Sequence, residues 1–178
     1  MAIRLLDRAI ASADSTISFT EGINSVHKEY VFDFFNMHPS NSNVDFMFQV
    51  NAAGESGYNE TITSSVLNLY NTEAAGAATK TADADLDQAQ GTAFQILAED
   101  TGNGATDSCS GSLRLFDPSD GTHATLFEAV VVNCFQGNSV STLTVGGYIN
   151  TVTAIDEIQF KFSAGNIDSG TIKMYGVL

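Results

Sequence analysis

Basic residues are scarce in this chain of 178 residues, which has 7 Lys and Arg against 21 Asp and Glu and a net charge of −14. Phosphate neutralisation requires clustered Lys and Arg side chains, whereas the seven here are scattered from Arg4 to Lys173. The sequence therefore predicts no direct nucleic-acid binding and no attraction to an anionic membrane surface. A negative surface instead favours solubility and repulsion between copies outside their intended contacts.

Long apolar runs, tryptophan and proline are also absent or rare. No window approaches the 18 consecutive apolar residues of a membrane-spanning helix. Arg4, Asp7 and Arg8 interrupt the N-terminal region, so it lacks the apolar core of a signal peptide. With only two prolines, stiff linkers are not expected. The length suits one domain with a core of its own.

Cysteine is too rare for a disulfide scaffold, because the chain has only Cys109 and Cys134. We interpret them as small strand residues that assembly in the cytoplasm would keep reduced. A bond between them stays open if their strands are neighbours.

What the chain does have is apolar and polar alternation with a period of two. Residues 43–51 alternate Val44, Phe46, Phe48 and Val50 with polar positions, the pattern of a half-buried antiparallel strand. Such segments recur at near-regular spacing, which predicts an all-β fold, an antiparallel β-sandwich with under about a tenth helix. Strands are expected at residues 15–20, 29–37, 43–51, 61–70, 93–98, 112–116, 123–135, 143–148, 156–162 and 171–177.

The last two of these strands are separated by a turn-forming segment, residues 163–170. Gly165 and Gly170 are available there for positive φ angles, so we expect a hairpin. Strand residues two apart share a face, so two pairs of phenylalanines are expected to be buried as pairs. The core candidates are Phe32, Phe34, Phe46, Phe48, Ile158, Phe160 and Phe162.

The N-terminal segment does not fit the strand pattern. Residues 1–14 precede the first alternating strand and show no partner strand of their own, so we interpret them as a short helix or, preferably, an arm, followed by a single sandwich domain at 15–178. Exposed aliphatic residues are costly unless covered, and arginines complement an acidic neighbour. Assembly contacts are therefore expected from Ile3, Arg4, Leu5, Leu6, Arg8 and Ile10.

An acidic, alanine-rich excursion follows the fourth expected strand. Asp83, Asp85 and Asp87 have the D-x-D-x-D spacing that opens an EF-hand loop, but Gln88 and Phe94 stand where Gly and Glu are required. A solvated loop is therefore the favoured interpretation, and a weak surface calcium site stays open.

Catalytic motifs are missing. His27, His38 and His123 are far apart and have no zinc-ligand spacing, and there is neither a G-x-S-x-G elbow nor a phosphate-binding G-K-[ST]. A Ser-His-Asp triad assembled in space stays open. The abundance of acids makes a glycosidase-like pair available by number alone, so it is weak evidence. We expect a protein without cofactor, metal or enzymatic activity.

Both ends of the expected domain resemble a family of virion structural proteins from tailed phages of marine bacteria. The resemblance lies in SFTEGINSVHKEYVFDFFNMHPS, VDFMFQVN and GYNETITSS, and in GGYINTVTAIDEIQFKFSAGNIDSGTIKMYGV at the C-terminus. In the last of these, an I-x-x-I-x-F strand leads through a G-N turn into S-G-T-I-x-x-Y-G. The resemblance covers most of residues 15–178.

This resemblance implies a jelly-roll-like sandwich carried in many copies on a virion, with no catalytic residues to transfer. It suggests a head decoration or cement protein on the outer surface of the particle, assembled in the host cytoplasm and bound to the major capsid protein or other virion proteins. A homo-oligomer, by analogy a trimer, is expected. The alternative is a tail or fibre module that binds host-surface carbohydrate, and copy number per virion separates the two.

Overall fold

The fold is entirely β in the part of the chain that the computed structural model describes, residues 2–74, 79–135 and 139–178. All ten expected strands are present, so the all-β prediction is confirmed; β1, β6 and β7 were missed. No helix in the described ranges is long and apolar enough to cross a membrane. The strands are β1 (Ile3–Asp14), β2 (Ile17–Phe19), β3 (Glu29–Pro39), β4 (Val44–Ala52), β5 (Ile62–Thr72), β6 (Thr79–Ala82), β7 (Ala89–Gly91), β8 (Gln95–Thr101), β9 (Ser108–Phe116), β10 (Thr125–Phe135), β11 (Ser139–Ile149), β12 (Ile155–Phe162) and β13 (Ile167–Val177).

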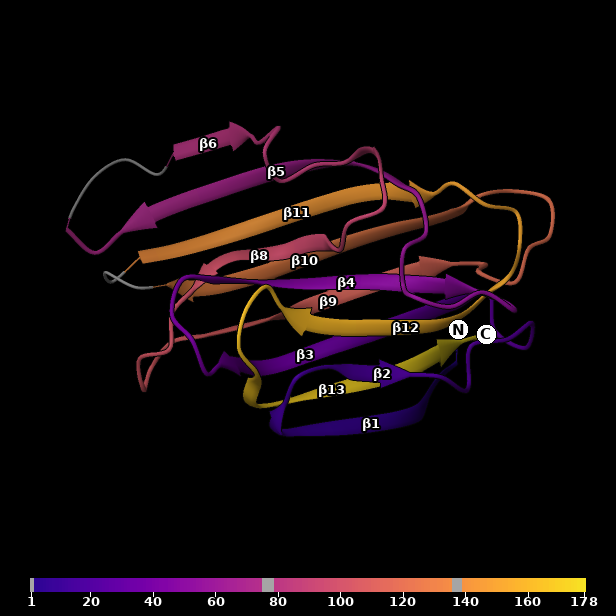
Figure 1. The fold of residues 1–178 in the computed structure, drawn as a ribbon, viewed down its shortest axis with the longest axis horizontal. Helices are drawn as coiled ribbons and strands as arrows, with labels where there is room; N and C mark the ends of the chain where they lie inside the picture. Colours follow the sequence, from indigo (N-terminus) through magenta and orange to yellow (C-terminus); the bar gives the residue numbers. More distant parts are fainter. Residues whose placement is uncertain (1, 75–78, 136–138) are drawn as a thin grey trace.

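Two antiparallel layers pack as a sandwich (Figure 1). The large sheet has the order β1-β13-β3-β9-β10-β11-β5, with β6 and β7 both paired to β5. The small sheet has the order β2-β12-β4-β8. A single bridge, between Phe135 and Thr101, joins β10 to β8. The two chain ends lie side by side, where the Leu178 amide donates to the Ala2 carbonyl oxygen at 3.0 Å.

Phenylalanine rings from both sheets fill the space between the layers. The Phe160 ring of β12 lies 5.6 Å from Phe32 and 5.2 Å from Phe34 of the large sheet. It also lies 6.4 Å from Phe19 and 6.0 Å from Phe46 of the small sheet. Such pairs add to the hydrophobic gain of burying the rings. The predicted core residues are all buried: Phe32, Phe34, Phe46, Phe48, Ile158, Phe160 and Phe162.

The predicted C-terminal hairpin is wrong. β12 pairs with β4 and β2, whereas β13 pairs with β1 and β3, so residues 163–166 cross from one sheet to the other. Two hydrogen bonds between Ser40 and Asn166 tie this crossing to the loop between β3 and β4. The expected positive φ angles are present, at 73° for Gly165 and 135° for Gly170. A turn between two alternating strands does not reveal whether the strands share a sheet.

The N-terminal segment has a partner strand, contrary to our expectation. β1 pairs with β13 along its whole length and forms one edge of the large sheet. Leu6 and Ala9 pack against the core, and Ala11 is buried in it. The register shifts between Leu5 and Asp7, and this bulge breaks the period-two pattern that would have marked a strand.

The acidic excursion covers one part of the core. Its turn begins at Asp83, whose carbonyl oxygen accepts from the Leu86 amide at 3.3 Å. Leu86 is buried, and the Gln95 side chain donates to its carbonyl oxygen at 3.0 Å. Leu86 therefore anchors the described part of the excursion to the core.

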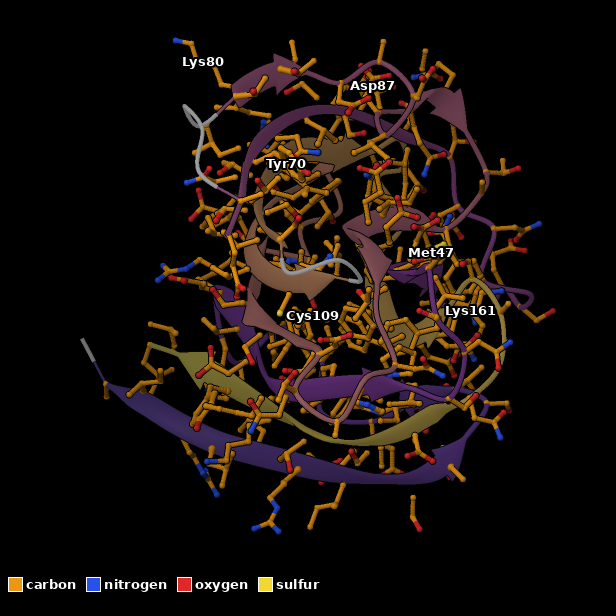
Figure 2. All side chains as sticks on the ribbon, turned by 90° about the vertical axis from the view of Figure 1, so that its left-hand side faces the viewer. Met47, Tyr70, Lys80, Asp87, Cys109 and Lys161 are labelled. Atoms are coloured by element: carbon orange, nitrogen blue, oxygen red, sulfur yellow. The ribbon has the colours of Figure 1, made fainter. Side chains whose placement is uncertain are left out.

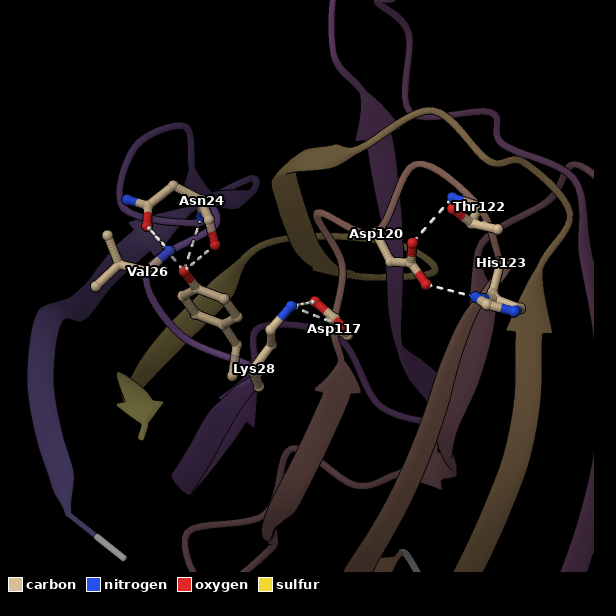
Figure 3. A network of polar contacts seen from close by, with 8 residues as sticks. Asn24, Val26, Lys28, Asp117, Asp120, Thr122 and His123 are labelled. Atoms are coloured by element: carbon tan, nitrogen blue, oxygen red, sulfur yellow. Dashed lines mark hydrogen bonds and ion pairs between the residues drawn. The ribbon is translucent and has the colours of Figure 1, made fainter.

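Polar contacts order the loops at one end of the sandwich (Figure 3). The Tyr30 hydroxyl donates to the Asn24 carbonyl oxygen at 2.7 Å. Lys28 binds both carboxylate oxygens of Asp117 at 2.9 Å, which ties the start of β3 to the end of β9. The side chains of His123 and Asp120 lie 2.6 Å apart within the loop before β10.

Candidate assembly surface

The outer face of the large sheet presents side chains of seven neighbouring strands to solvent. The pairing registers place Leu5, Tyr175, Val31, Arg114 and Glu128 in one row across β1, β13, β3, β9 and β10. Residues opposite each other on neighbouring strands are in side-chain contact distance. We call this solvent-facing side of the large sheet, from β1 to β5, the outer face.

Strand β1 supplies aliphatic residues to the outer face. Ile3, Leu5 and Ile10 are 63%, 50% and 58% exposed. Arg4 and Arg8 are also exposed, whereas Leu6 packs against the core. The structure therefore leaves five of the six expected contact residues accessible. A surface depression is lined by Ile3, Glu29, Val31, Asp33, Arg114 and Val177.

Charges at the centre of the outer face are paired with one another. Arg114 contacts Glu29 at 2.8 Å and Glu128 at 3.7 Å, which joins β9 to both of its neighbours. The Lys173 ammonium lies 4.9 Å from the centre of the Phe35 ring. Exposed pairs of this kind contribute little to stability. Arg114 and Lys173 therefore offset part of the negative charge that Glu29, Asp33 and Glu128 bring to this part of the face.

A second aliphatic group lies on the outer face beyond this charged strip. Val130 and Val132 of β10, Val140 of β11, and Leu67 and Leu69 of β5 are each 41–47% exposed. The registers connect them through threonines of β11. Sequence reasoning missed this group, although consecutive apolar residues in β10 indicate a strand with apolar side chains on both faces.

The two cysteines are free and cannot pair in this fold. Cys109 is buried on the inner face of β9, and burial raises the pKa of its thiol to about 12. Cys134 on β10 is partly exposed. Its neighbour Asn133 is the residue opposite Cys109, so the Cys134 side chain points to the other face of the sheet. Burial, and then the Asp107 carboxylate, raise the pKa of Cys134, so neither thiol is activated as a nucleophile.

In the part of the chain that the structure describes, the three histidines lie apart from one another. His38 is opposite Ser169, its Nε2 donates to the Gly104 carbonyl oxygen at 3.1 Å, and its Nδ1 lies 3.8 Å from Asp168 Oδ2, beyond hydrogen-bond distance. His27 and His123 lie in two separate loops, whereas His38 lies in β3. Within the described ranges, no three His, Cys, Asp or Glu residues are grouped to hold a metal, which includes the aspartates of the D-x-D-x-D segment.

Lowering the pH from 7 towards about 5 is expected to raise Tm. Burial is the main cause that raises the pKa of four carboxyl groups, those of Asp33, Asp45, Glu99 and Asp156. The folded chain therefore binds protons more readily than the unfolded chain, so the stability from these groups is fully present below about pH 4 and is lost as the pH rises through their raised pKa values. Thermal melts at constant ionic strength test this, and a Tm that falls steadily over that range would contradict it.

Comparison with known proteins leaves the chain without an assigned family. No family model matches it, and no curated protein matches it. A solved structure of a structural-genomics protein of unknown function from Bacteroides ovatus is similar over 77% of this chain, with 10% sequence identity and a TM-score of 0.22. The match spans 45% of that protein's length. A likeness at this level establishes neither fold nor function.

Proposed function

We propose that the chain is a non-enzymatic structural protein of a bacteriophage virion, a decoration or cement protein on the outer surface of the head. The observation that carries the proposal is the outer face, which exposes aliphatic side chains at both ends of one continuous sheet. A soluble monomer rarely exposes contiguous apolar patches above a few hundred Å² unless they bind something. Together with the family resemblance, this supports a protein built to lie against other virion proteins.

The order of the strands supports a jelly-roll-like arrangement. Eight strands pair as β1 with β13, β2 with β12, β3 with β9 and β4 with β8, so the outermost strands of the sequence enclose the inner ones. Jelly rolls, which recur in viral capsid and lectin domains, are double-sheet folds of eight strands. In this interpretation β5 to β7, β10 and β11 are insertions that extend the large sheet.

The partners that we propose are the major capsid protein or other virion proteins and further copies of this chain, by analogy in a trimer. Copies with a net charge of −14 repel each other. Contact is least unfavourable where charge is paired or absent, as on the outer face. Arg4 and Arg8 on the exposed edge would complement an acidic neighbour, and such pairs weaken with added salt.

Copy number tests the proposed location. Mass spectrometry of purified virions is expected to find hundreds of copies per particle. A handful to a few tens of copies would contradict a head protein and support the alternative, a tail or fibre module that binds host carbohydrate. Absence of the chain from purified virions would overturn both.

Replacing Ile3, Leu5 and Ile10 together by serine is expected to lower particle binding at least tenfold and to leave Tm within a few degrees. All three side chains are exposed, so the folded chain loses little, whereas each buries apolar surface in the assembly. Binding to heads that lack the protein is measured by sedimentation, with melting curves of the same variants.

The matched control changes Val26 and Val152, which are equally exposed but lie in loops. Serine at both positions is expected to leave particle binding unchanged. Equal losses in the two variants, or no loss in the first, would show that the outer face is not the contact. Point substitutions are preferred to deletion of residues 1–12, because deletion would uncover the buried edge of β13.

A further inference from the structure

Polar side chains of β5, β8, β10 and β11 meet inside the sandwich next to Tyr70, which is labelled in Figure 2 and is the β5 partner of Ser141. They belong to Asn68, Glu99, Asn133 and Ser141, and we call this group the Glu99 pocket. Asn133 is fully buried, Ser141 is 3% exposed, and Glu99 is partly exposed. Asn133 and Ser141 are direct partners on neighbouring strands. Polar side chains therefore replace the aliphatic core at this place.

The amide groups of the pocket have a fixed orientation. The Asn68 Nδ2 group donates to Glu99 Oε2 at 3.3 Å, and the Asn133 Nδ2 group donates to the Glu99 carbonyl oxygen. Both amide nitrogens are thus used, and both Oδ1 atoms remain buried without a hydrogen-bond partner, as does Ser141 Oγ. A buried acceptor without a partner is destabilising, because it has lost its hydrogen bonds to water. Three such oxygens, on the neighbouring strands β5, β10 and β11, are available to an electropositive partner.

Unpaired negative charge surrounds the same pocket. Burial, and then the carboxylates of Asp100, Asp83, Asp45 and Asp85, raise the pKa of Glu99. None of the ion pairs in the described ranges involves any of these five carboxyl groups. Asp83 and Asp85 belong to the acidic excursion, which the fold brings to β8 although its EF-hand pattern is incomplete.

We propose that the Glu99 pocket binds a calcium ion. Its potential ligands are all oxygens, one carboxylate, two amide carbonyls and a hydroxyl, which is the ligand set of hard cations. Calcium accepts six to eight oxygens in flexible geometry, so water completes the shell from the exposed side, whereas magnesium demands a stricter octahedron. The nearby aspartates attract the ion without coordinating it. With one carboxylate ligand, the expected dissociation constant is about 10⁻⁴–10⁻³ M.

Calcium titration of the full chain tests the site independently of the proposed virion role. The protein is first washed with EDTA, and Tm is then followed as CaCl2 is added. A saturable rise is expected, larger than that produced by MgCl2. Because salt also relieves repulsion in an acidic protein, NaCl at matched ionic strength is the reference. A calcium response no larger than the NaCl response would overturn the proposal and leave the pocket to buried water.

Three variants locate the ion. Glu99→Gln keeps the shape of the side chain but removes its charge. Asn68→Ala removes one amide oxygen at a less buried position. Each variant is expected to weaken calcium binding, measured by calorimetry, at least tenfold. The control is Asp87→Asn, in the acidic excursion but not among the neighbours of Glu99. Loss of calcium binding in Asp87→Asn alone would place the ion in the D-x-D-x-D loop and overturn the assignment. Unchanged calcium binding in both Glu99→Gln and Asn68→Ala would also overturn it.

Discussion

Replacing Phe160 by alanine is expected to lower the free energy of unfolding by about 3–5 kcal/mol. The ring is fully buried and contacts rings of both sheets, with Phe34 and Phe32 on one side and Phe46 and Phe19 on the other. Truncation removes the apolar surface and leaves a cavity that close-packed neighbours fill only in part. Because the neighbours belong to strands of different sheets, collapse of the cavity would require the layers to move together.

The measurement is urea unfolding followed by circular dichroism, with Phe35→Ala as the control. Phe35 is also a strand phenylalanine, but it lies on the outer face and is 42% exposed. Its truncation is expected to cost less than about 1 kcal/mol. Similar losses for the two variants would show that the inner and outer faces have been assigned incorrectly.

Period-two alternation predicted these faces because it reports directly on which side of a strand is buried. In residues 44–50 the alternating apolar residues Val44, Phe46, Phe48 and Val50 are buried, as are Phe160 and Phe162, although Gln49 on the opposite face is buried as well. Alternation says nothing about which strands pair. The patterns of β12 and β13 are equally compatible with a hairpin and with a crossing between sheets, and the crossing depends on distant contacts such as that between Ser40 and Asn166.

The candidate sites were predictable only where their residues are consecutive. The aliphatic character of the N-terminal segment led us to predict Ile3, Leu5 and Ile10 as contact residues, and the structure leaves them exposed. The bulge concealed the strand, and with it the inward position of Leu6. The Glu99 pocket gives no sequence signal. Its residues come from four strands, spread between positions 68 and 141, and each amide or hydroxyl alone is typical of an exposed strand position.

Replacing Gly111 by alanine is expected to destabilise the protein by about 3 kcal/mol, at the upper end of the usual cost of overpacking. Gly111 lies in β9, where it is opposite Phe34 of β3 and Val131 of β10. A Cβ atom at this position would collide with the Val130 carbonyl oxygen and lie 2.7 Å from the Val131 Cα. These are backbone atoms held by the ladder between β9 and β10, so relief requires the two strands to separate.

The control is Gly146→Ala in β11, where an added Cβ meets nothing within 4 Å. Alanine there adds only a methyl group on an exposed sheet face, and we expect a change within about 0.5 kcal/mol. Chemical denaturation of both variants gives the comparison. β9 joins the four-stranded half of the large sheet to its extension through β10, so strand separation at Gly111 also loosens the connection between the two aliphatic groups of the outer face. Gly111→Ala should therefore lower particle binding as well as stability, whereas an unchanged unfolding midpoint would mean that β9 and β10 do not pair in this register.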